Sequence, residues 1–169
     1  MPGRSPSQTV GPYFAIALPW KDGGRVTGCS GERIVLEARI IDGAGQPVPD
    51  ALVETWQAPD RDAPPSPDGK PHGFGRASAD ASGLYRIETA MPAGPVPYLD
   101  VTILARGLLK HLHTRVYFAD EARVRREAAL APLSSSPRLS TLVARKARAG
   151  EYRWDVRLQG EDETVFFAA

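Results

Sequence analysis

Two of the chain's three histidines, His111 and His113, stand two residues apart in the sequence. On a β-strand, residues at this spacing share one face, so both imidazoles would point the same way and could form part of a metal site. A metal ion needs several converging ligands, however, and the sequence offers no further ligand set near this pair. We therefore expect both histidines to form hydrogen bonds within the fold or at a subunit contact, and we expect this chain to hold no metal.

The two histidines belong to a mainly apolar stretch, residues 99–118, that is typical of two consecutive strands. Arg106 and Gly107 divide this stretch, because glycine at such a point favours a turn or a bulge. An arginine at a strand turn is ordinarily solvated or ion-paired at the surface. The central feature of the chain is therefore a predicted pair of strands that meet at Arg106.

The whole chain has 169 residues, which is enough for one domain with a sizeable core. Glycine and proline number 16 each, which favours many turns without reaching the level typical of disorder. The net charge of +1 gives no reason to expect nucleic acid or an anionic membrane as a partner. The single cysteine, Cys29, excludes an internal disulfide and a cysteine-rich metal site. Without a signal-peptide pattern or an apolar run of about 18–20 residues, we expect a cytoplasmic protein.

Short runs rich in Val, Ile and Tyr recur along the chain between turn residues. About seven or more short strands at near-regular spacing predict an all-β fold, a single β-sandwich with Greek-key-like connections. We assign residues 32–169 to this sandwich. Its best-patterned strands are expected over residues 33–41, 51–56, 84–89, 99–118 (the central pair) and 152–158.

Two segments depart from the strand pattern. Residues 59–72 contain five prolines and are expected to form a surface loop. One short helix is expected from Glu121 to about Ala129, with Asp120 as its N-cap. In the strand before the loop, the large side chain of Trp56 is expected in the core rather than in a site.

Residues 1–31 carry little periodic signal, and their prolines favour an extended N-terminal arm. The arm also carries large apolar side chains that must be buried on this domain or on a partner chain, namely Tyr13, Phe14, Ile16, Leu18 and Trp20. We therefore predict that the arm contacts a partner subunit.

Four stretches carry longer motifs. They are Pro-Ser-Gln-Thr-Val-Gly-Pro-Tyr at residues 6–13, Val-Glu-Thr-Trp-Gln-Ala at 53–58, the central strands at 104–118, and the closing residues 159–167. Together they resemble the intradiol ring-cleavage dioxygenases, and within that family the α-subunits of its two-subunit members. The resemblance runs nearly end to end.

The family resemblance implies a β-sandwich and a non-haem Fe(III) held by two tyrosines and two histidines. At the matching positions this chain has Pro64, Tyr98 and Asp100, and residues 91–97 lack the remaining tyrosine. The resemblance therefore implies an iron-free α-subunit, inactive alone, whose partner β-subunit binds the iron. Together they would use O₂ to open 3,4-dihydroxybenzoate between its hydroxyl-bearing carbons, which gives 3-carboxy-cis,cis-muconate.

The same resemblance implies which residues of this chain would line the shared substrate cavity. Thr9, Gly11, Pro12 and Tyr13 would contribute from the arm, and Arg106 from the central turn. An arginine fork suits an aromatic carboxylate or its ring-opened product, so Arg106 gains a substrate-binding role beside its role as a surface ion pair.

Two other interpretations remain open. A self-sufficient metalloenzyme would use His111 and His113 as ligands, and metal analysis of the isolated chain separates it from the iron-free subunit. A non-catalytic sandwich of transthyretin-like type would bind a small ligand or carbohydrate, but such a module has no need of the specific arm motif.

Overall fold

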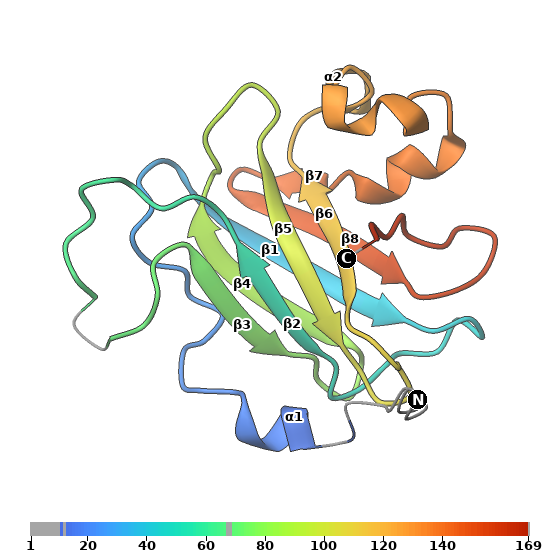
Figure 1. Cartoon of the computed structure of the whole chain (residues 1–169), viewed down its shortest axis with the longest axis horizontal. Helices are drawn as coiled ribbons and strands as arrows, with labels where there is room; N and C mark the ends of the chain where they lie inside the picture. Colours follow the sequence, from blue (N-terminus) through green and yellow to red (C-terminus); the bar gives the residue numbers. More distant parts are fainter. Residues whose placement is uncertain (1–10, 12, 67–68, 169) are drawn as a thin grey trace, which may run out of the picture.

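Two four-stranded sheets face each other in the part of the chain that the computed structural model describes, residues 11, 13–66 and 69–168 (Figure 1). The first sheet, in the order β4-β1-β8-β7, comprises β1 (Arg33–Ile41), β4 (Leu84–Ala90), β7 (Arg145–Arg148) and β8 (Glu151–Arg157). The second sheet, in the order β3-β2-β5-β6, comprises β2 (Leu52–Trp56), β3 (Phe74–Ser78), β5 (Tyr98–Leu104) and β6 (Leu112–Tyr117). The predicted all-β sandwich is confirmed.

The core lies between the inner faces of the two sheets. In β1, alternate side chains from Ile34 to Ile40 are buried, and in β8 the alternate side chains of Tyr152, Trp154 and Val156 are buried. The second sheet contributes its own alternate positions from β5. Fully or nearly fully buried members of this core include Leu36, Ile40, Val53, Ile87, Leu99, Val101, Ile103, Val116, Trp154 and Val156.

Strand β1 occupies the middle of the first sheet. It pairs antiparallel with β4 and parallel with β8, with Val35 opposite Glu151 and Ile41 opposite Arg157. A parallel neighbour cannot be reached by a hairpin, so the chain completes the whole second sheet before β8 returns to β1. The first and last strands of the sandwich are therefore direct neighbours.

The arm differs locally from the extended conformation expected for it. Tyr13–Ala17 form a single helical turn, α1, with Phe14 buried beneath it. Further along, the carbonyl of Gly23 accepts a hydrogen bond of 2.7 Å from the Arg76 amide of β3, and that of Gly24 accepts one of 2.8 Å from the Glu88 amide of β4. The root of the arm thus bridges one edge strand of each sheet.

A second apolar cluster lies outside the sandwich, beside β6. It joins Tyr117 to α2 (Glu121–Val124) and to the 3₁₀ segments Ala128–Leu133 and Pro137–Leu142. Asp120 is the helix N-cap as predicted, because its side chain accepts a 2.9 Å hydrogen bond from the Arg123 amide.

The expected extent of that helix is wrong. The α-helix ends at Val124, and the backbone of Glu127 is extended before the 3₁₀ segment begins. The side chain of Arg125 donates to the carbonyls of Ser134 and Ser136, which draws the following segment back over the helix end. Side-chain bonds to distant carbonyls therefore turn the chain where propensity alone favours a longer helix.

Two further expectations are corrected by the strand faces. Trp56 is 47% exposed and does not enter the core, because the inward positions of β2 are Val53 and Thr55. His111 lies before β6 begins and is exposed, so it does not share a strand face with His113.

Candidate functional site

The arm residues of the predicted cavity are only partly within the described chain. Thr9 and Pro12 lie outside the described residues, whereas Gly11 has a positive φ of 67°, which glycine adopts readily. Tyr13 opens α1 and is 76% exposed, as is Ile16 one turn later. The helix therefore buries Phe14 against the domain and presents Tyr13 and Ile16 outward.

Arg106 stands in the connection between β5 and β6. Its Nε lies 3.1 Å from Oδ2 of Asp50, and its side chain is 59% exposed. Asp50 has a positive φ of 58°, and its other carboxylate oxygen, Oδ1, is buried. The ion pair uses Nε of the guanidinium, whose remaining donors are the two terminal nitrogens. The β5–β6 connection and α1 both lie at the lower end of the sandwich in Figure 1.

A shallow surface hollow of about 440 Å³ adjoins Arg106. Its walls are mostly apolar or backbone, with Pro47, Leu108 and Leu158 among them, and Asp42 and Asp50 supply carboxylates. The hollow is open, so on this chain alone Arg106 faces solvent beside an incomplete wall rather than an enclosed cavity.

A charged cluster covers the outer face of the central strands. Asp100 of β5 lies opposite Arg115 of β6, and Oδ1 of Asp100 accepts a 2.8 Å hydrogen bond from Nε of Arg115. The guanidinium carbon of Arg115 lies 4.4 Å from the ring centre of Tyr98, in cation–π contact. His113 is half-buried, with Nε2 3.6 Å from the same Asp100 oxygen.

The electrostatics of this cluster favour a charged arginine. Partial burial works against its charge, but the neighbouring Tyr117 and Asp100 outweigh burial and raise the pKa of Arg115. Burial raises the pKa of Tyr117, whose phenol therefore stays neutral. The cluster is an arginine held between a carboxylate and aromatic rings.

These residues do not fit a ferric ion. Tyr98 and Asp100 stand at two of the positions where the family resemblance implies iron ligands, yet both face the cationic Arg115. At the third position, Pro64 offers only its carbonyl, which lies 2.7 Å from Nε2 of His72. Among the described residues, no three His, Cys, Asp or Glu side chains converge as metal ligands would. A guanidinium so close to phenol and carboxylate opposes a second cation.

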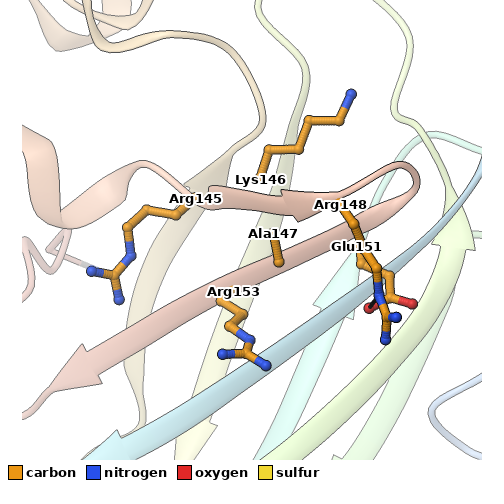
Figure 2. A pocket seen from close by; sticks show the side chains of 6 residues that line it. All are labelled: Arg145, Lys146, Ala147, Arg148, Glu151 and Arg153. Carbon is orange, nitrogen blue, oxygen red and sulfur yellow. Dashed lines mark hydrogen bonds and ion pairs between the residues drawn. The ribbon is translucent and has the colours of Figure 1, made fainter.

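A separate basic hollow lies on the other sheet, at the β7–β8 hairpin (Figure 2). Arg148 bonds to Glu151 at 2.6 Å, and Lys146 points away from Arg153. Strand β7 is an edge strand, and a register shift interrupts its pairing between Lys146 and Arg148. Positive charge and irregular pairing are the means by which edge strands avoid pairing with other chains, so this hollow has a structural explanation.

Comparison with known proteins places the chain in a family. A family model described as Dioxygenase matches residues 21–100. The protocatechuate 3,4-dioxygenase alpha chain of Burkholderia cepacia is 38% identical over 97% of this chain and 96% of its own length. The chain belongs to the intradiol dioxygenases, among the protocatechuate 3,4-dioxygenase alpha chains. This confirms the family inferred from the four motifs.

Other relatives of the family agree. The protocatechuate 3,4-dioxygenase beta chain of Burkholderia cepacia is 32% identical over 79% of this chain and 67% of its own length. Among solved structures, the dioxygenase domain of a carbohydrate-binding fusion from Streptomyces sp. SirexAA-E superposes with a TM-score of 0.57 at 22% identity. That superposition covers 95% of this chain and 98% of the other, and at this identity it supports the fold alone.

No helix in the described part of the chain has the length and apolar character that a bilayer crossing requires.

Proposed function

We propose that the chain is the iron-free alpha subunit of a heteromeric protocatechuate 3,4-dioxygenase. Its partner is the protocatechuate 3,4-dioxygenase beta subunit, which carries the non-haem Fe(III). The complex opens 3,4-dihydroxybenzoate between its two hydroxyl-bearing carbons, and both atoms of O₂ enter the product, 3-carboxy-cis,cis-muconate. The alpha subunit supplies no metal ligand and completes the wall of the cavity.

The observation that carries this proposal is the ion pair between Asp100 and Arg115. It occupies the face of β5 where the resemblance implies iron ligands, and it replaces a metal charge with that of a guanidinium. An alpha chain with this cluster depends on another subunit for iron.

The surface supports a partner at the arm. Among the described residues of the arm and β2, the large apolar side chains of Tyr13, Ile16, Leu18 and Trp56 are exposed. Aromatic and large apolar side chains are enriched at the centre of protein interfaces, where burial against a partner stabilises the complex. The beta subunit would cover this surface.

In the assembled cavity, Thr9, Gly11, Pro12 and Tyr13 shape the wall from the arm. Arg106 binds the carboxylate of the substrate or of its product through its terminal nitrogens, while Asp50 holds Nε. The iron, when bound to the partner, supplies the chemistry that joins oxygen to the ring. This chain orients and encloses the substrate.

Co-expression with the cognate beta chain tests the proposal. The complex should contain iron, absorb visible light and consume one O₂ per 3,4-dihydroxybenzoate, whereas the isolated chain should be colourless and inactive. Stoichiometric iron in the isolated chain would favour the self-sufficient metalloenzyme instead. Failure to associate with the beta chain would favour the transthyretin-like binding module.

A further inference from the structure

The joint between the arm and the sandwich is built around Arg76 of β3. Its Nε and Nη2 donate to Oε1 of Glu54 on β2 over 2.8 and 2.5 Å, and its Nη1 donates to the carbonyl of Leu18 over 3.0 Å. The Arg76 side chain is only 17% exposed. One guanidinium thus joins the arm to two strands of the second sheet.

Aromatic rings complete the joint. The guanidinium carbon of Arg76 lies 4.4 Å from the ring centre of Trp20 and 5.3 Å from that of Phe74. The two rings are themselves 5.8 Å apart. A partly buried guanidinium over an aromatic ring is stabilised by cation–π attraction, which an ammonium on a flexible stem reproduces poorly here.

Backbone hydrogen bonds also contribute to this joint. The Arg76 amide donates to the carbonyl of Gly23 over 2.7 Å, and a Cβ on Gly23 would come within 2.4 Å of the Arg76 carbonyl. Upstream, the Leu18 amide donates to the carbonyl of Phe14, which links the joint to α1. The joint is therefore connected to Tyr13 through one hydrogen-bonded helical turn.

We propose that Arg76 is a positioning residue, which holds Leu18 and Trp20 against Glu54 and Phe74 and thereby fixes the position of Tyr13 at the start of α1. A purely structural ion pair between β3 and β2 would need only the contacts to Glu54. The third donor is directed to a backbone carbonyl of the arm instead. The consequence for catalysis rests on the proposed function, in which the arm lines the substrate cavity.

The test compares Arg76→Ala and Arg76→Lys with Arg138→Ala in the alpha–beta complex. Arg138 is a matched control, because it likewise bonds one carboxylate and backbone carbonyls, those of Glu163 and Thr164, in a different segment. Two quantities are measured: hydrogen exchange of the arm amides from Tyr13 to Asp22, and steady-state kinetics with 3,4-dihydroxybenzoate.

We expect Arg76→Ala to accelerate exchange of the arm amides and to raise KM about tenfold. A tenfold change corresponds to the free energy of about one charged hydrogen bond, the one that holds the arm through Leu18. The kcat, the iron content and exchange in β1 and β5 should stay close to those of the wild type. Arg76→Lys should recover part of the KM, and Arg138→Ala should alter neither the arm amides nor KM.

Unchanged arm exchange in Arg76→Ala would overturn the proposal, as would faster arm exchange with an unchanged KM. Arg76→Lys keeps the test valid if the alanine variant does not fold, because it retains charge but cannot bond Glu54 and Leu18 as a fork. An inactive wild-type complex would contradict the proposed function instead, and arm exchange alone would then decide whether Arg76 holds the arm.

Discussion

Nε of Arg115 and Oδ1 of Asp100 lie 2.8 Å apart across the central strand pair, in the positions where β5 and β6 are directly opposite each other. Both side chains are about three-quarters shielded from solvent, and Tyr98 covers the guanidinium. Each charged group loses much of its hydration on folding, and the ion pair compensates for that loss.

Replacing Asp100 by asparagine should show how strongly the cluster depends on this pair. The loss of the carboxylate leaves a shielded guanidinium without its counter-charge, so the free energy of unfolding should fall by about 1–3 kcal/mol. Asp155→Asn is the matched control, because Asp155 pairs with Arg145 at 3.3 Å on the exposed surface. Its cost should not exceed about 0.5 kcal/mol. Urea denaturation of both variants measures the difference, and equal costs would contradict it.

The two histidines should differ in their effect on stability. His111 is exposed, so His111→Ala should change the free energy of unfolding by less than about 0.5 kcal/mol. His113 is half-buried beside Asp100 and Phe167, so His113→Ala should cost about 1 kcal/mol. The double variant should still assemble with a beta chain and leave its iron content unchanged. Iron lost from an intact complex would show that the pair has a metal-binding role after all.

Arg106→Ala should lower kcat/KM of the alpha–beta complex by about ten- to a hundredfold, because a charged donor to the substrate carboxylate is removed. Arg106→Lys should recover only part of this loss, since an ammonium lacks the planar fork. Arg86→Ala is a close control: Arg86 is 55% exposed and pairs with Glu88 at 3.1 Å, much as Arg106 pairs with Asp50. If the two alanine variants have the same kinetics, Arg106 is merely a surface ion pair.

Gly73 should tolerate no side chain. Its φ is 72°, and a Cβ would come within 2.1 Å of the Gln57 carbonyl, so Gly73→Ala should cost about 3 kcal/mol or more. Gly69 has nearly the same φ, 69°, but no atom of the described residues lies within 4 Å of its Cβ position. Gly69→Ala therefore isolates the backbone conformation from the clash and should cost about 1 kcal/mol. Thermal unfolding of the two variants should separate these contributions.

Tyr85→Phe should leave the protein as stable or make it more stable by up to about 1 kcal/mol, because the buried hydroxyl has no hydrogen-bond partner among the described residues. Burial raises the pKa of Tyr85 above its ordinary value of 10.0. A raised pKa in the folded state favours folding below the unfolded pKa and opposes it as the pH rises beyond that value. The wild type should therefore lose stability above about pH 10, and the phenylalanine variant should lose less. Denaturation midpoints at pH 8 and pH 10.5 provide the comparison.

Local sequence patterns were sufficient to predict the strands whose two faces differ clearly in polarity. The expected strand at residues 33–41 coincides with β1, and the strand expected over residues 152–158 is β8, shifted by one residue and with alternate side chains buried. The inward face of β2 was harder to predict, because Leu52 and Val53 are both apolar and both buried, on opposite faces. With no clear alternation there, the outward direction of Trp56 could not be deduced.

The charged cluster and the arm joint depend on contacts that no local pattern contains. A tight turn centred on Arg106 and Gly107 would place Asp100 opposite His113, whereas the observed connection places Asp100 opposite Arg115. The length of that connection depends on the packing of both strands. Arg76 and Leu18 are 58 residues apart in the sequence, so only the folded sandwich brings the guanidinium to the arm.

Because β1 pairs with β8, the first sheet can be completed only after nearly the whole polypeptide has been synthesised. More than one hundred residues separate Val35 from Glu151, its partner, so a nascent chain on the ribosome carries β1 with one edge unpaired until nearly all of it has been translated. Such an edge is a template for association with other unfinished chains. A polypeptide truncated before residue 151 would therefore be an aggregation-prone fragment rather than a smaller folded protein.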